Sequence, residues 1–126
     1  MAEQRARPQV AGVYVARHPE HPDTKLGCTE DLARRLLDSG YRLLFARPWA
    51  YEYAFEVEGA TAKERKDNAY ALEQATLRAL EGERLLRRHA DNGERMETTP
   101  LPAAAVDALV QRVAAAAGIG YSRRVR

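Results

Sequence analysis

The 126-residue sequence predicts a single α+β domain, in which a small, mostly antiparallel sheet of three strands is packed by three helices. Three observations predict this class. Two β-rich segments flank a proline-containing turn near the start of the chain. Apolar and polar residues alternate strictly near the middle, and three further segments carry apolar residues at helical spacing.

The strands are predicted from local composition. Residues 10–17 are rich in valine and end before a histidine-proline pair, so they predict the first strand. Residues 19–23 contain two prolines and predict a turn, and residues 24–28 form a second strand that pairs with the first as a hairpin. The alternating segment 51–57 predicts a third strand with one buried face. Residues 96–99 predict a short fourth strand at the edge.

Each predicted helix begins after a start signal and ends at a glycine. The first helix covers residues 30–40 and has two acidic residues in its first turn. The second, over residues 62–82, follows a capping box formed by Thr61 and Glu64. The third covers residues 102–118 and starts with a proline.

The chain divides into three parts. Residues 1–9 predict a polar N-terminal arm, residues 10–117 the folded domain, and residues 118–126 a mobile, basic C-terminal tail. Residues 89–95 predict a loop within the domain.

Composition excludes several classes of protein. The net charge of +2 is too small to identify a nucleic-acid-binding protein by charge alone. The single cysteine, Cys28, excludes an internal disulfide framework. No apolar run approaches the roughly 18 residues of a membrane span, and the first residues lack the apolar core of a signal peptide. We therefore expect a cytoplasmic protein with no membrane partner.

Two histidines, His18 and His21, flank the predicted turn together with Glu20 and Asp23. Such a set could bind a metal, but histidines beside prolines are more often surface residues. His18 follows the first strand directly, so it could alternatively reach an active centre.

Three short motifs follow one another along the chain: GVY at residues 12–14, KLG at residues 25–27 and DLARRL at residues 31–36. Together they resemble the GIY-YIG nuclease superfamily. In that family a Gly-Ile-Tyr strand and a Tyr-Ile-Gly strand form a hairpin before a helix with an Asp-Leu-x-x-Arg-Leu pattern. The spacing of 11 positions from Tyr14 to Lys25, and of 21 from Tyr14 to Arg35, fits this pattern. Lys25 stands in place of the second tyrosine, which resembles a branch of phages, large DNA viruses and bacteria that carries Lys-Ile-Gly-x-Thr.

The resemblance implies roles for four residues. Tyr14 would deprotonate or orient a metal-bound water, and Arg35 would contact the scissile phosphate. Glu73, in a Leu-Glu pair that fits the family's metal-binding helix, would be the single protein ligand of Mg²⁺ or Mn²⁺. Lys25 would contact a phosphate or act on Tyr14 by proximity. In a helix, Glu73 would lie beside the apolar stripe, where a carboxylate needs a partner or a metal.

Further residues are candidates around this centre. Gly12 and Gly27 would allow close approach of the hairpin and a ligand. Arg17, His18 and Arg34 would supply additional phosphate contacts.

The function implied is a metal-dependent endonuclease that hydrolyses phosphodiester bonds in DNA, with one metal and a tyrosine-oriented water. Two alternatives stay open, because Lys25 replaces the tyrosine and residues 94–97 lack the aromatic pair of this branch. The first is a catalytically inactive nucleic-acid-binding module, and the second is a protein-interaction module. DNA is the expected partner, RNA is left open, and a homodimer or a targeting partner would add affinity.

Overall fold

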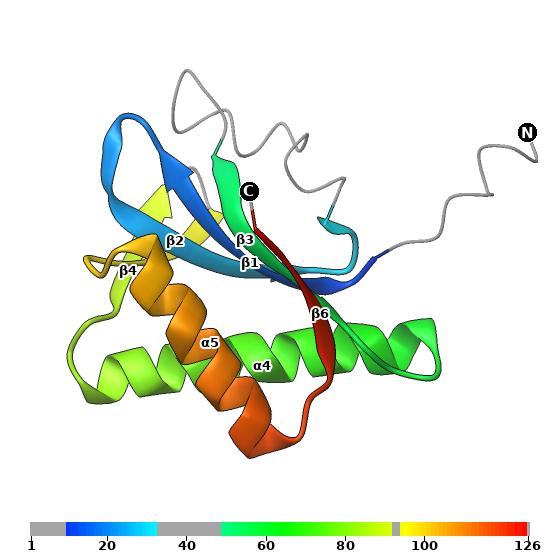
Figure 1. Ribbon diagram of the computed structural model, residues 1–126. Helices are drawn as coiled ribbons and strands as arrows, with labels where there is room; N and C mark the ends of the chain where they lie inside the picture. Colours follow the sequence, from blue (N-terminus) through cyan, green and yellow to red (C-terminus); the bar gives the residue numbers. More distant parts are fainter. Residues whose placement is uncertain (1–9, 33–48, 92–93, 126) are drawn as a thin grey trace, which may run out of the picture.

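The computed structural model describes residues 10–32, 49–91 and 94–125, and it has α+β architecture (Figure 1). The strands are β1 (Gly12–His18), β2 (His21–Thr29), β3 (Ala50–Val57), β4 (Arg87–Asp91), β5 (Glu94–Thr99) and β6 (Tyr121–Val125). The helices are α4 (Ala62–Gly82) and α5 (Ala103–Ala117). All described strands pair antiparallel, in the order β4-β5-β2-β1-β3-β6.

The prediction of a three-stranded sheet with three helices is therefore wrong. The described ranges contain a six-stranded sheet and two helices. Most of the first predicted helix, over residues 30–40, lies outside the described residues. The short strand predicted at residues 96–99 is present as β5, and the loop predicted at residues 89–95 contains most of β4.

The C-terminal strand β6 occupies the segment that the sequence predicts to be a mobile tail. Its arginines bond to neighbouring elements. Arg123 donates two hydrogen bonds to Asp107 of α5, at 2.7 and 2.6 Å, and Arg124 pairs with Glu56 of β3 at 2.6 Å. The Asp107 bond raises the pKa of Arg123 above its ordinary value. These partners, distant in sequence, let an arginine-rich segment form an edge strand without apolar alternation.

Other sequence predictions are confirmed. The hairpin of β1 and β2 forms, with Tyr14 opposite Gly27. The helix α4 begins at the predicted N-cap, where the Thr61 hydroxyl accepts from the Glu64 N–H at 3.1 Å. The Glu64 carboxylate accepts in return from the Ala60 N–H at 2.8 Å. The helix α5 ends at Gly118, whose φ of 71° is the left-handed conformation that favours glycine.

The two helices cover one face of the sheet (Figure 1). Strand residues such as Val13 and Val15 point to that face and pack with Leu72 of α4 and Val110 of α5 in the larger core. The intervening Tyr14 belongs to a second cluster on the opposite face. Neither described helix is long and apolar enough to cross a membrane.

Candidate active site

The candidate active site lies on the sheet face opposite the helices. Alternation along β1 sends Tyr14 and Ala16 to this face, where they pack with Trp49 and Met96. Residues opposite each other in antiparallel strands share a face, so Lys25 of β2, which pairs with Ala16, also points here. The sheet therefore places two of the predicted site residues on neighbouring strands and on the same side.

Tyr14 and Lys25 form a buried hydrogen-bonded pair. The Lys25 Nζ donates to Tyr14 Oη at 2.7 Å and lies 4.7 Å from the centre of the tyrosine ring. The exposed fractions are 1% for Tyr14 and 6% for Lys25. The ring of Tyr51 stacks on Tyr14, with ring centres 4.9 Å apart. Removing an ammonium from water costs free energy, and the hydrogen bond to the phenol oxygen offsets part of that cost. Because either side chain would lose this bond if it moved, the contact constrains both.

The two motif glycines make room for this arrangement. A Cβ on Gly27 would overlap the Tyr14 phenol oxygen, so the ring lies across β2 where glycine has no side chain. A Cβ on Gly12 would overlap the Phe55 carbonyl oxygen and the Leu32 side chain. Both positions therefore require glycine for close packing.

Glu73 is buried on α4, at 8% exposure, beside Leu72. Its carboxylate accepts a hydrogen bond from the side-chain amide of Gln74 at 3.0 Å. The helix α4 packs on the opposite face of the sheet from Tyr14 and Lys25. Strand β5 pairs with Thr24, Lys25 and Leu26 of β2.

The remaining candidates divide into two groups. Arg34 and Arg35 lie outside the described residues. Arg17 donates to the Pro22 carbonyl at 2.8 Å, and His18 accepts from the Glu20 N–H at 3.0 Å, so both contribute to the hairpin turn. His18 is 2% exposed and packs edge-on against Trp49, which places it in the protein interior rather than on the surface.

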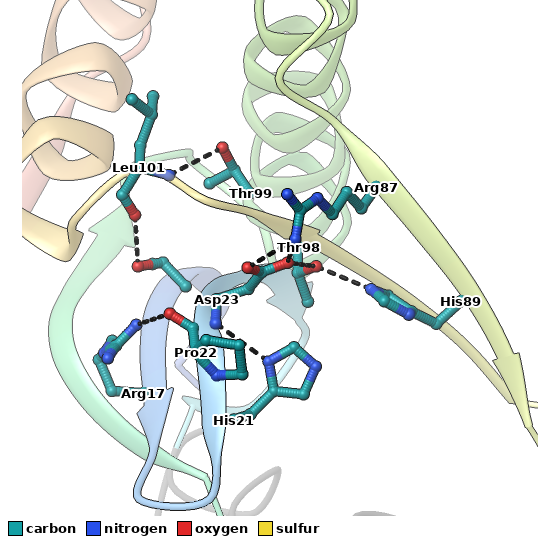
Figure 2. Close-up of polar contacts among 10 residues, drawn as sticks. Arg17, His21, Pro22, Asp23, Arg87, His89, Thr98, Thr99 and Leu101 are labelled. Atoms are coloured by element: carbon teal, nitrogen blue, oxygen red, sulfur yellow. Dashed lines mark hydrogen bonds and ion pairs between the residues drawn. The ribbon is translucent and has the colours of Figure 1, made fainter.

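A polar network that has no local signal in the sequence begins at Asp23 (Figure 2). The Asp23 side chain is 3% exposed and accepts from Arg87 Nη1 at 3.1 Å and from the Thr98 hydroxyl at 2.8 Å. The Thr98 hydroxyl is in turn 2.8 Å from His89 Nε2. This network joins the β1–β2 hairpin to the β4–β5 hairpin, which pairs with β2 through only three residues, Thr24, Lys25 and Leu26.

The histidines of the turn do not form a metal centre with their acidic neighbours. Within the described ranges, no group of three or more His, Cys, Asp or Glu side chains could hold a metal ion. His21 Nδ1 accepts from the Asp23 N–H at 3.1 Å, and its ring packs on Trp49 and His89. Burial lowers the pKa of His21 below its ordinary value, so this imidazole stays neutral near pH 7.

The fold and the site together define an α+β domain with a buried tyrosine–lysine pair on the face of an antiparallel sheet opposite its two described helices. The chain belongs to the family of the T5orf172 domain, a phage-associated domain whose pattern matches residues 11–114. No curated protein and no solved structure matches the chain.

The overlap at Gly27 predicts the effect of a single methyl group. Gly27→Ala should displace the Tyr14 ring, alter the near-ultraviolet circular dichroism and lower the free energy of unfolding by about 1–3 kcal/mol, as overpacking does. Gly82→Ala is the matched control, because no atom lies within 4 Å of a Cβ there. Urea unfolding measures both variants. Equal stabilities with unchanged spectra would show that the phenol does not cross β2.

The lowered pKa of His21 predicts a dependence of stability on pH. The unfolded chain, with an ordinary pKa of 6.5, binds a proton more readily than the folded chain. Neutral His21 therefore favours folding above about pH 6.5, and this contribution is lost as the pH falls through that value. His21→Asn keeps an acceptor for the Asp23 N–H. Its urea midpoint should fall less than that of the wild type between about pH 7.5 and pH 5, and parallel curves would contradict this.

Proposed function

We propose that the protein is a metal-dependent endonuclease of the GIY-YIG type, which acts on phosphodiester bonds in DNA in the cytoplasm. The observation that carries the proposal is the hydrogen bond from Lys25 to Tyr14 across Gly27, which joins two of the proposed catalytic residues. The family match supports a nuclease or DNA-binding role.

The proposed work of the pair is to position a water and a phosphate. Lys25 donates a hydrogen bond to Tyr14 Oη, which fixes the position of the phenol oxygen. A phenol held in this way can orient an attacking water by one hydrogen bond. The Lys25 ammonium adds positive charge beside the same oxygen, where a phosphate oxygen would gather negative charge in the transition state. Arg35 is proposed to contact that phosphate as well.

Glu73 is the proposed metal ligand. Among the described residues its buried carboxylate accepts one hydrogen bond, from Gln74, and so keeps lone pairs for a cation. Mg²⁺ fits a site with a single carboxylate, because it keeps several waters and takes further oxygens from the substrate phosphate. When bound, the metal would act as a Lewis acid on the phosphate and lower the pKa of a bound water. The part of Glu73 would be to hold the cation through its carboxylate.

One observation favours a second candidate function, a nucleic-acid-binding or protein-interaction module without catalysis. The helix that carries Glu73 packs on the face of the sheet opposite Tyr14. If the Glu73 carboxylate remains on the helix-covered face, a metal bound to it would not reach the Tyr14–Lys25 pair on the other face. The two functions differ in whether divalent cations produce cleavage.

A plasmid assay tests the proposed function. The wild type should nick supercoiled DNA with Mg²⁺ or Mn²⁺ and not with EDTA. Glu73→Gln keeps the shape of the side chain and its neighbour Gln74 but removes the charge that binds the cation. We expect its nicking rate to fall at least about a hundredfold, because one electrostatic contact to the reacting phosphate has that magnitude.

The matched control is Glu81→Gln on the same helix. The Glu81 side chain is 55% exposed and pairs with Arg88 at the surface, so its loss should leave the rate unchanged. Nicking by Glu73→Gln at the wild-type rate would remove Glu73 from the site. A folded wild type that leaves the plasmid intact with either metal would favour the module without catalysis.

A further inference from the structure

The imidazole of His89, on the edge strand β4, is held in one tautomer by the Asp23 network. A threonine hydroxyl has one hydrogen, and that of Thr98 is donated to the Asp23 carboxylate at 2.8 Å. The same oxygen therefore accepts from His89 Nε2–H at 2.8 Å. The Asp23 carboxylate also accepts from Arg87, so its oxygens set the direction of both bonds.

This arrangement leaves the second nitrogen of His89 available. Within the part of the chain that the structure describes, the contacts of His89 are the bond to Thr98 and an edge-on contact with the His21 ring at 5.7 Å. Figure 2 shows Nδ1 on the side of the ring away from Thr98. The His89 side chain is partly exposed, so Nδ1 is within reach of a ligand in solvent. A protonated His89 would then donate a hydrogen bond from a fixed position.

The sheet register places His89 on the same face as the Tyr14–Lys25 pair. Lys25 is opposite Thr98, and Thr98 is opposite Arg87, which lies two residues before His89 on β4. His89 itself is opposite Met96, which packs in one cluster with Tyr14. Two strand spacings separate β2 from β4, so His89 lies roughly 10 Å from the strand that Tyr14 crosses.

The charges around His89 favour an anion when the ring is protonated. The facing groups among the described residues are Asp23, His21 and Lys25 from β2, Thr98 from β5 and Arg87 from β4 itself. The charge of Asp23 is balanced by Arg87. His21 contributes no charge near pH 7, because burial lowers its pKa and its Nδ1 already accepts from the backbone. A proton on His89 therefore adds a positive charge to the face of the sheet that also carries Lys25.

We infer that protonated His89 binds a DNA phosphate through Nδ1, adjacent to the phosphate held at Tyr14 and Lys25, and so extends the substrate site across β5 to β4. This inference rests on the proposed function in taking DNA as the substrate and in placing one phosphate at Tyr14 and Lys25. It assigns to Asp23 and Thr98 the role of positioning residues, which orient His89 without touching the substrate. It also predicts that DNA affinity depends on the protonation of one side chain.

The test is binding of a fluorescently labelled DNA duplex in EDTA, followed by anisotropy at about pH 6 and about pH 8. His89→Gln is the variant of choice, because the glutamine amide can replace Nε2–H as the donor to Thr98 while the titrating nitrogen is removed. We expect it to weaken binding about tenfold at the lower pH, the effect of one charge-assisted hydrogen bond, and not at the higher pH. The salt dependence of binding at the lower pH should correspond to about one phosphate contact fewer.

His21→Asn is the matched control and should bind like the wild type at both pH values. Thermal unfolding of each variant shows that the fold is kept. Wild-type affinity of His89→Gln at the lower pH, or an equal loss at both, would overturn the inference. Because EDTA prevents cleavage, a wild type that binds with the expected pH dependence but never nicks DNA would overturn the proposed catalysis alone. Absence of DNA binding by the wild type would overturn both.

Discussion

The site depends on the absence of a side chain at Gly27. The Tyr14 ring can lie across β2 and reach the Lys25 ammonium only because no Cβ occupies the position beneath the phenol oxygen. Tyr51 then covers the other side of the ring, and its own hydroxyl donates to the Leu32 carbonyl at 2.7 Å. Close packing of this kind fixes polar atoms more firmly than exposed hydrogen bonds do, because each group would lose contacts in any other position.

A second constraint holds the β4–β5 hairpin beside this pair. Only three residues of β2 pair with β5, which is a short ladder for an element at the edge of a sheet. The buried carboxylate of Asp23 compensates, because it accepts hydrogen bonds from β4 and β5 at once. Removal of one partner from such a buried network leaves a desolvated charge, so the network favours one arrangement of the two hairpins. The face of the sheet that carries Tyr14 and Lys25 is thereby extended by two strands.

The sequence predicted the parts of the site that follow from local pattern. Tyr14, Lys25 and Gly27 lie on adjacent strands of a hairpin whose turn was recognisable, so strand alternation alone brings them to one face. The capping box before α4 likewise placed the helix of Glu73. The sequence did not show that this helix packs on the opposite face from Tyr14, because the path of the chain between elements has no local signature. The roles proposed for these residues stay predictions.

The size of the sheet and the Asp23 network could not be predicted for a related reason. The bonds from Arg87 and Thr98 to Asp23 join residues 64 and 75 positions apart. The strands β4 and β6 lack apolar alternation, and their arginines find carboxylates on other elements. Tertiary pairing therefore decided the structure where local propensity was weak.

The most direct test of the account is a double-mutant cycle on the nicking rate, with Tyr14→Phe, Lys25→Met and the double variant. If the two side chains act as one unit, each single variant should lose nearly all of the activity and the double variant should be no slower than either. Independent losses that multiply in the double variant, or full activity in Lys25→Met, would contradict the claim that the pair is the centre of the site.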